Sequence, residues 1–124
     1  MISVVVPVLN EAENIRALIG EIVAASERTP IREIVYVDDG STDETLRLLR
    51  EEMLRVPMLR VVHHDRPMGQ SAAFLSGGRA ASQELLAFID GDLQNDPADI
   101  ALLYERYRTE AAQRPKIAVL GQRA

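Results

Sequence analysis

The sequence contains no cysteine, and this absence excludes several kinds of chemistry at once. Without a thiol, the chain has no cysteine nucleophile, disulfide framework, thiolate zinc site or iron–sulfur cluster. A basic excess is also lacking, because 14 lysines and arginines stand against 19 aspartates and glutamates, for a formal net charge of −5. Nucleic-acid binding relies on basic side chains that neutralise phosphates, so the acidic balance argues against a protein whose main role is to hold nucleic acid.

Long apolar runs are missing as well. No run approaches the ~18 residues of a membrane-spanning helix, and no basic stretch precedes an apolar one at the N-terminus. The sequence therefore predicts neither a span nor a signal peptide, and the cytoplasm is the default location. With 124 residues, 47% of them hydrophobic, the chain has the size and composition of one globular domain whose core needs no disulfide or metal.

Apolar residues follow a strand period and a helix period in turn along the chain. The predicted strands are Ile2–Leu9, Ile34–Val37, Leu59–His63, Leu85–Ile89 and Ile117–Leu120. The predicted apolar helix faces are Ile15, Leu18, Ile19, Ile22 and Val23; then Leu46, Leu49 and Met53; and, after an Asp96-Pro97 start, Ile100, Leu103, Tyr104 and Tyr107. This alternation predicts an α/β fold with right-handed crossovers, a mostly parallel sheet and helices on both faces.

Two local patterns refine the helices. Ser41-Thr42-Asp43-Glu44 fits a capping box, in which the Ser and Glu side chains satisfy the backbone N–H groups of a helix start. The helix predicted over Gly69–Ser82 carries small residues at every fourth position, namely Gly69, Ala73, Gly77 and Ala81. One of its faces therefore carries almost no side chain, and we expect another part of the structure to approach its backbone closely.

Polar residues follow three of the predicted strands: Asn10-Glu11, Asp38-Asp39 and Asp90-Gly91-Asp92. In open parallel sheets, ligands bind beyond the carboxyl ends of the strands, near the point where strand order reverses. Asp90 and Asp92 are suited to hold one hard cation such as Mg²⁺ or Mn²⁺, while Gly91 lets a ligand lie against the backbone. The alternative is a turn, since Asp and Gly are common turn residues.

The other polar positions also have two interpretations each. Asp38 and Asp39 either form a turn before the capped helix or place a carboxylate on a nucleobase or ribose. Adjacent carboxylates repel each other, so a purely structural turn would rarely need both of them. Asn10-Glu11 either starts the first helix or joins the site. His63 and His64 point to opposite faces of a strand and cannot easily share a metal. Gly69-Gln70-Ser71 either cradles a phosphate or simply opens a helix.

In order, these motifs resemble the family 2 glycosyltransferases of the GT-A fold. The similar branch contains dolichol-phosphate mannose synthase and the bacterial polyprenyl-phosphate glycosyltransferases. The segments that carry the resemblance are Val4–Glu11, Val37–Asp43, Gly69 through Ala73 to Gly77, and Asp90–Pro97. The resemblance covers essentially the whole chain. It implies a Rossmann-like nucleotide-diphospho-sugar transferase fold over residues 1–124, shortened to the N-terminal, donor-binding half, because family members are roughly twice as long.

The resemblance also implies roles for particular residues. Those implied to bind the nucleotide-sugar are Pro7, Leu9, Glu11, Val37, Asp39, Asp90, Gly91, Asp92 and Arg123, the last by meeting the donor phosphates. Leu9 stands where the mannose synthases often carry an aromatic residue. The DXD-type pair Asp90 and Asp92 is implied to be catalytic and, with Gln94, to bind Mg²⁺ or Mn²⁺.

The implied activity is metal-dependent, inverting transfer of a sugar from a UDP- or GDP-linked donor to a polyprenyl or dolichyl phosphate, or to a related cell-envelope acceptor. Such a hexosyltransferase is expected at the cytoplasmic face of the membrane, with peripheral association. One alternative is a nucleotide-sugar-binding half-domain that does not turn over alone. A receiver-type signalling domain is disfavoured, because its phosphorylated Asp would follow the third strand, where His63-His64 stands. An unpaired fifth strand also predicts self-association into a homo-oligomer.

Overall fold

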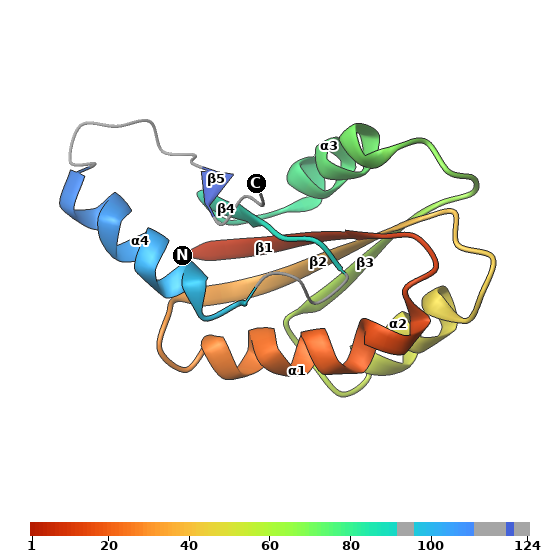
Figure 1. The fold of residues 1–124 in the computed structure, drawn as a ribbon, viewed down its shortest axis with the longest axis horizontal. Coiled ribbons are helices and arrows are strands. Elements are labelled where there is room, and N and C mark those ends of the chain that lie inside the picture. Colours follow the sequence, from red (N-terminus) through yellow and green to blue (C-terminus); the bar gives the residue numbers. More distant parts are fainter. Residues whose placement is uncertain (92–95, 111–118, 121–124) are drawn as a thin grey trace.

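The computed structural model describes residues 1–91, 96–110 and 119–120, and they form one parallel sheet with helices on both faces (Figure 1). The strands are β1 (Ile2–Val8), β2 (Ile31–Asp39), β3 (Leu59–His64), β4 (Leu85–Phe88) and β5 (Val119–Leu120). The helices are the short 3₁₀ helix η1 (Ala12–Asn14) and the α-helices α1 (Ile15–Ala25), α2 (Thr45–Met53), α3 (Gln70–Ala80) and α4 (Asp99–Glu110). The predicted α/β architecture is confirmed.

The order of the strands is β3-β2-β1-β4-β5, and every neighbouring pair is parallel. The chain adds β2 and β3 on one side of β1 and then crosses over to add β4 and β5 on the other side. Strand order therefore reverses between β1 and β4, and the carboxyl ends of these two strands flank the position where ligands bind in such sheets.

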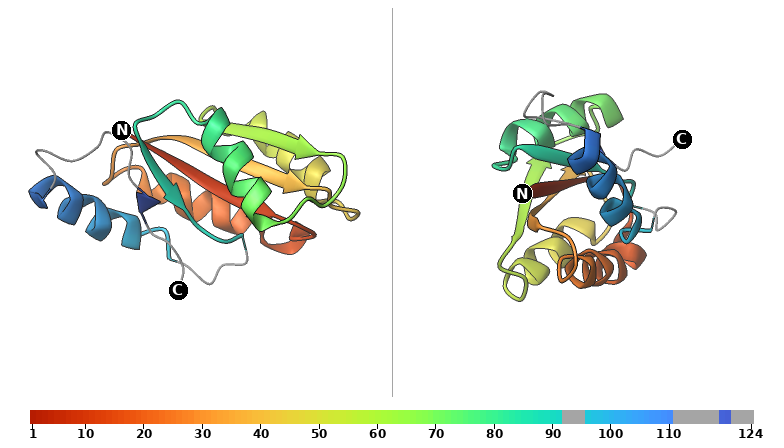
Figure 2. Two further views of the ribbon diagram at one scale, coloured as in Figure 1. Left: turned by 90° about the horizontal axis from the view of Figure 1, so that it is seen from above. Right: turned by 90° about the vertical axis from the view of Figure 1, so that its left-hand side faces the viewer.

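One face of the sheet carries large side chains. Ile2, Val4 and Val6 of β1 alternate toward this face, as a strand requires, and α1 covers them (Figure 2). The predicted apolar stripe of α1 is confirmed, with Ile15, Leu18, Ile19 and Ile22 buried and Val23 packed beside them. The α4 residues Ile100, Leu103, Tyr104 and Tyr107 join the same core, again as predicted.

The strands present mainly valine on the opposite face, and α3 lies on it. A Cβ added at Gly77 would stand 2.3 Å from Val5 Cγ1 and 3.0 Å from Val37 Cγ2, so the helix backbone rests almost directly on β1 and β2. The stripe of small residues thus allows the close approach to the helix backbone that the sequence predicts, and the sheet is what approaches it. Phe74 and Phe88 meet edge-on beside it, with ring centroids 4.9 Å apart.

The second strand is longer than the apolar pattern predicts, because buried charges extend it at both ends. Glu33 is buried near its start, where it accepts hydrogen bonds from Ser3 Oγ at 2.7 Å, Ser82 N at 2.7 Å and Arg60 Nη1 at 3.0 Å. Burial alone would raise the pKa of Glu33, but these donors outweigh it and hold the pKa below its usual value. A carboxylate supplied with partners can occupy a buried strand position.

The capping box predicted over residues 41–44 does not form. The Ser41 hydroxyl instead accepts a hydrogen bond from Asn10 N at 2.9 Å, and α2 begins at Thr45, whose N–H donates to Asp43 Oδ1 at 2.9 Å. The buried face of the helix also differs from the prediction. Met53 is 41% exposed, whereas Thr45, Leu49 and Glu52 face inward.

The last described strand, β5, pairs with β4 at one edge of the sheet. Of the predicted segment Ile117–Leu120, the first two residues lie outside the described part of the chain. The predicted start of α4 is placed slightly early, since the helix begins at Asp99, although Asp96 Oδ1 does accept a hydrogen bond from Ala98 N at 2.9 Å. Within the described residues, no helix combines the length and apolarity needed to cross a membrane.

Candidate functional site

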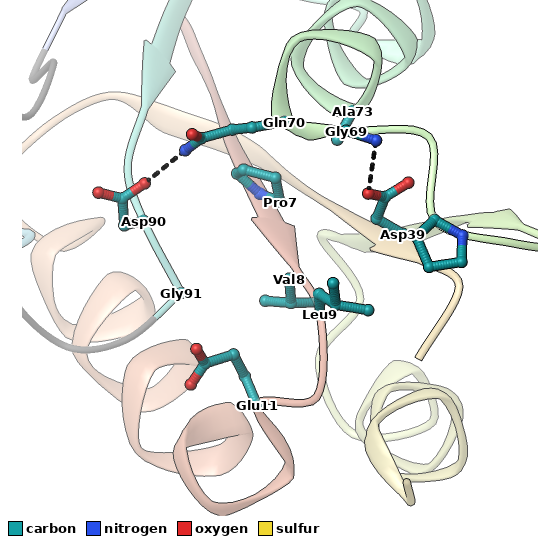
Figure 3. Close-up of a pocket in the computed structure, with 11 residues that line it drawn as sticks. Pro7, Val8, Leu9, Glu11, Asp39, Gly69, Gln70, Ala73, Asp90 and Gly91 are labelled. Carbon is teal, nitrogen blue, oxygen red and sulfur yellow. Dashed lines mark hydrogen bonds between the residues drawn. The ribbon is translucent and has the colours of Figure 1, made fainter. Parts of the chain in front are cut away.

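A pocket of about 400 Å³ opens at the carboxyl ends of β1, β2 and β4, where strand order reverses (Figure 3). The first turn of α3 forms one wall of this pocket. The lining residues are Pro7, Val8, Leu9, Glu11, Asp39, Pro67, Gly69, Gln70, Ala73, Asp90 and Gly91. This volume falls in the range of small-molecule sites, and the position is the one that the topology indicates.

Most of the residues singled out from the sequence line this pocket. They are Pro7, Leu9, Glu11, Asp39, Asp90 and Gly91. Val37 does not line it, because its side chain is fully buried under α3 beside Gly77. Asp92, Gln94 and Arg123 lie outside the described residues. The structure therefore brings together three separate strand ends that the sequence lists far apart.

Asp39 accepts hydrogen bonds on both of its carboxylate oxygens. Its Oδ1 accepts hydrogen bonds from His64 Nδ1 at 2.9 Å and Met68 N at 2.9 Å, and its Oδ2 accepts one from Gly69 N at 3.0 Å. Burial raises the pKa of this group, but the hydrogen bonds from His64 and the two backbone amides outweigh burial and lower it. Asp39 therefore carries its negative charge at neutral pH.

The adjacent carboxylates Asp38 and Asp39 do not face each other. Strand alternation sends Asp38 to the α1 and α2 side, where it is fully buried, accepts a hydrogen bond from Ser41 N at 3.2 Å and lies 3.0 Å from His63 Nδ1. The repulsion expected between the two groups is thus avoided, because each one has its own histidine on β3. As predicted, His63 and His64 point to opposite faces.

Asn10 is a structural anchor that sequence reasoning missed. It adopts a positive φ of 55°, and its Oδ1 accepts hydrogen bonds from Thr42 N at 2.8 Å and Asp43 N at 3.2 Å. Both interpretations of Asn10-Glu11 find support, because Glu11 directly precedes the 3₁₀ turn η1 that leads into α1 and also lines the pocket. Asparagine tolerates the left-handed conformation better than most residues, so an asparagine directly after a strand is the sequence feature that could have indicated a turn here.

Glu11 is held at the mouth of the pocket by neighbours on both sides. Its backbone N–H donates to Thr45 Oγ1 at 3.0 Å, and its Oε1 accepts a hydrogen bond from Asn14 Nδ2 at 2.8 Å. The carboxylate reaches the lining from the segment that follows β1 (Figure 3). A negative charge is thereby fixed on the pocket wall.

Gln70 is a second residue whose role the sequence did not reveal. From the first turn of α3, its Nε2 donates to Asp90 Oδ1 at 3.0 Å and so joins two walls of the pocket (Figure 3). Of the two interpretations of Gly69-Gln70-Ser71, the structure supports the helix start, since α3 begins at Gln70 and the Gly69 N–H is already bonded to Asp39. Gly69 has a φ of +100°, which favours glycine at this helix start.

Two glycines let backbone segments come together around the pocket. A Cβ at Gly91 would stand 2.4 Å from Val8 Cγ1. The space beside this glycine, which the sequence predicts to hold a ligand, is therefore filled in part by β1. Gly40 has a φ of +79°, and a Cβ there would lie 2.4 Å from the Arg66 carbonyl carbon and from Pro67 N. The turn after β2 therefore touches the loop after β3 backbone to backbone.

The chemistry of these side chains suits a divalent cation bound together with a phosphorylated ligand. Asp90 offers the carboxylate oxygen that Mg²⁺ and Mn²⁺ prefer. Among the described residues there is no cluster of three or more histidine, cysteine, aspartate or glutamate side chains able to enclose a metal. A cation at Asp90 would need further oxygen ligands from phosphates, from water or from residues 92–95, which is how Mg²⁺ is commonly held.

A parallel α/β sheet with carboxylates gathered in a pocket at its topological switch point defines the class of open, doubly wound α/β domains that bind ligands at that point. Within that class the family is clear. Residues 3–119 match the family described as "Glycosyl transferase family 2", and the chain belongs to it. The family inferred from the motifs is confirmed.

Named relatives are consistent with this membership. The chain is 45% identical, over 101 residues, to the "Dodecaprenyl-phosphate galacturonate synthase" of Rhizobium johnstonii, covering 80% of this chain and 30% of that protein. It is 39% identical over 107 residues to the "Undecaprenyl-phosphate 4-deoxy-4-formamido-L-arabinose transferase" of Edwardsiella ictaluri, covering 84% and 33%. The chain thus spans about a third of the length of these relatives.

Solved structures show the same fold. The "Mannosyltransferase PcManGT from Pyrobaculum calidifontis in complex with GDP-Man and Mn2+" superposes with a TM-score of 0.65 at 30% identity, covering 73% of this chain and 27% of that one. A crystal structure of S. aureus TarS superposes with a TM-score of 0.66 at 26% identity, covering 90% and 31%. These likenesses support the GT-A architecture predicted from the motifs.

Proposed function

We propose that residues 1–124 form the donor-binding, N-terminal part of a GT-A glycosyltransferase. It would use a UDP- or GDP-linked sugar, bind Mg²⁺ or Mn²⁺, and transfer the sugar with inversion to a polyprenyl or dolichyl phosphate. The observation that carries this proposal is the convergence of Glu11, Asp39 and Asp90 from three strand ends on one pocket at the switch point. The names of the two relatives support a polyprenyl-phosphate acceptor.

The nucleoside end of the donor belongs, in this proposal, at Pro7, Leu9 and Asp39. Leu9 is 43% exposed at the pocket and offers an apolar surface to a base, while the ionised Asp39 accepts hydrogen bonds from base or ribose. Val37 supports this region from below and does not touch the ligand, since it is completely buried. Arg123 is proposed to meet the donor phosphates.

The diphosphate end belongs at Asp90 and Gly91, with Asp92 and Gln94 as further proposed metal ligands. A bound divalent cation would stabilise the negative charge that develops on the departing nucleoside diphosphate. The chain itself orients the ligands, because the Gln70 amide holds Asp90 Oδ1 and Gly91 packs against β1 at Val8. The presence of GDP-Man and Mn²⁺ in the mannosyltransferase structure supports a divalent cation.

A lipid phosphate acceptor would be ionised near neutral pH and would require no general base. The reaction therefore needs the pocket mainly to bind and orient the donor and to stabilise its leaving group. We propose that it takes place at the cytoplasmic face of the membrane, with the protein associated peripherally. Self-association through the β5 edge of the sheet is proposed as well, and light scattering during size-exclusion chromatography tests it.

A second candidate function is donor binding without turnover. The observation in its favour is that the chain spans only about a third of the length of its relatives. Incubation of the purified chain with undecaprenyl phosphate and radiolabelled UDP- or GDP-sugars separates the two candidates. Product formation supports the complete reaction, whereas tight donor binding without product supports the binding module.

The deciding experiment is calorimetric titration of the chain with UDP- and GDP-sugars, with and without Mn²⁺. Asp90→Asn is the informative variant, because asparagine keeps an oxygen that accepts from Gln70 but loses the charge that a cation needs. Asp65→Asn is its matched control, since that side chain is fully exposed and outside the lining. We expect metal-dependent binding to fall at least tenfold in Asp90→Asn and in Asp92→Asn, and to be unchanged in Asp65→Asn.

The absence of any metal-dependent nucleotide binding by the unaltered chain would contradict the proposed function. Equal losses in Asp90→Asn and Asp65→Asn would show instead that general surface charge, and not the pocket, attracts the ligand. Circular dichroism checks that each variant keeps the fold.

A further inference from the structure

A chain of hydrogen bonds runs behind the pocket and connects three elements. Ser76 Oγ on α3 lies 2.8 Å from His64 Nε2, and His64 Nδ1 lies 2.9 Å from Asp39 Oδ1. The His64 side chain is only 11% exposed and Asp39 only 8%. No function described above uses His64, although it contacts a carboxylate of the pocket.

The direction of these bonds follows from the acceptor. An ionised carboxylate only accepts hydrogen bonds, so Nδ1 of His64 carries the hydrogen that it shares with Asp39. In the neutral ring, Nε2 is then an acceptor, and the Ser76 hydroxyl donates to it. The ring is held at both ends, which fixes its orientation on β3.

The hydrogen bonds on Asp39 are unevenly distributed between its two oxygens. His64 Nδ1 and Met68 N both donate to Oδ1, whereas Gly69 N donates to Oδ2. A carboxylate oxygen accepts about two hydrogen bonds, so Oδ1 is saturated and Oδ2 retains one acceptor position. An N–H or O–H group of a ligand in the pocket can therefore bond Asp39 only at Oδ2.

We propose that His64 is a positioning residue for the donor site, which saturates Oδ1 of Asp39 and leaves Oδ2 for the nucleoside. The inference rests on the proposed function, because it takes the ligand of this pocket to be a nucleotide. His64 also secures the loop that leads into α3, since the same carboxylate holds Met68 N and Gly69 N. Gln70, which holds Asp90, follows directly in the chain.

The neighbouring pair His63 and Asp38 supplies a matched control. It repeats the same chemistry in the same strands, with His63 Nδ1 3.0 Å from Asp38 Oδ2, but on the opposite face of the sheet and away from the pocket lining. A change at His63 alters the adjacent position of the same strand without touching Asp39, although the His63 side chain is more exposed, at 34% against 11%.

The test uses amide side chains that replace one ring nitrogen at a time. Asparagine places an N–H near the position of Nδ1 and so keeps the bond to Asp39, whereas glutamine reaches only the position of Nε2. We expect His64→Gln and His64→Leu to weaken binding of whichever of UDP and GDP the unaltered chain prefers by about tenfold, the loss of one charge-assisted hydrogen bond. His64→Asn, Ser76→Ala and His63→Asn should stay within about threefold of the unaltered chain.

Two results would overturn the inference. Binding by His64→Gln as tight as that of the unaltered chain would show that Asp39 needs no support, and equal losses in His64→Asn and His64→Gln would show that the ring only packs. Failure of the unaltered chain to bind either nucleotide refutes the proposed function instead. In that case the backbone amide resonances of Met68 and Gly69 still decide the positioning role, because they should move in His64→Gln and not in His64→Asn.

Discussion

The two faces of this sheet are built from different side chains, and the difference explains where the pocket lies. Under α1 the strands present isoleucine, leucine and tyrosine together with valine, whereas under α3 they present valine, with Phe88 beside it, against alanine and glycine. We call the face under α3 the thin face and the face under α1 the thick face. The thin face lets α3 lie close to β1, so that the start of this helix, with Gly69, Gln70 and Ala73, forms a wall of the pocket. A thicker layer would hold that turn away from the strand ends.

Both faces end in an Asp–His pair at the carboxyl end of β2 and β3. The pair on the thick face, Asp38 with His63, is away from the pocket, and its aspartate is completely buried. The pair on the thin face, Asp39 with His64, borders the pocket. Equivalent chemistry therefore serves stability on one side and, by our proposal, ligand binding on the other.

The largest effect is expected from thickening the thin face. Gly77→Ala adds a Cβ that would lie 2.3 Å from Val5 Cγ1, so α3 or β1 must shift. We expect a loss of about 3 kcal/mol in the free energy of unfolding, the upper part of the range for overpacked cores. Urea denaturation measures this loss, and an unchanged midpoint would show that the α3 face is not tightly packed.

The second effect separates the two Asp–His pairs. Asp38→Ala leaves Ser41 N without its acceptor and should cost about 2 kcal/mol of stability, with little change in nucleotide affinity. Asp39→Asn, which keeps the shape but loses the charge, should instead weaken nucleotide binding about tenfold. Thermal unfolding and calorimetric titration measure the two quantities, and a reversed pattern would exchange the roles assigned to the two faces.

The third effect concerns pH. The pKa values of Asp39 and Glu33 are held below their ordinary values of 3.8 and 4.5, and that of Asp43 is lowered as well. Groups with lowered pKa values stabilise the fold above the unfolded-state pKa and lose this contribution as pH falls through the folded-state pKa. The contribution of these three carboxylates should thus be fully present from pH 7 to about 5 and should decline below about 4.5.

The acid decline should become shallower when the thin-face carboxylates are neutralised. Glu33→Gln with Asp39→Asn removes two of the three groups, so the slope of stability against pH below about 4.5 should decrease. Denaturant midpoints between pH 3 and 7 provide the measurement. A slope equal to that of the unaltered chain would locate the acid-sensitive groups elsewhere.

The smallest effect is expected on the thick face, where Gly20 lies exposed in α1 with nothing within 4 Å of an added Cβ. Gly20→Ala should stabilise the chain by about 0.5–1 kcal/mol, because alanine loses less backbone entropy in a helix. It is also the control for Gly77→Ala, since the same substitution should have the opposite sign. Destabilisation by Gly20→Ala would indicate that α1 is already strained.

Much of the fold could be predicted from the sequence because periodicity reports burial directly. The stripe of α1, the small face of α3 and the parallel order of elements all follow from spacing. Element ends were less predictable. Ser41 matches a helix cap, yet Asn10, distant in sequence, donates its N–H to that hydroxyl, and Glu33 extends β2 only because Ser3, Arg60 and Ser82 meet it there.

The candidate site was predictable in its carboxylates but not in their partners. Asp39 and Asp90 stand at strand ends, where topology alone gathers them. The groups that hold them, His64 and Gln70, come from β3 and α3, and their positions depend on how closely those elements pack. Packing distance is a tertiary property that local spacing does not encode.

The contact between Gly40 and the Arg66–Pro67 backbone restricts how this pocket can change over evolution. Side chains in the lining can be exchanged to suit another ligand, but Gly40 lies outside the lining and still determines how closely the loop after β3 can approach β2. Any side chain at that position would push on the Arg66–Pro67 backbone, which directly precedes the two residues, Met68 and Gly69, that bond Asp39. New ligand preferences can therefore arise by substitution within the pocket, while the outline of its rim depends on one position outside it.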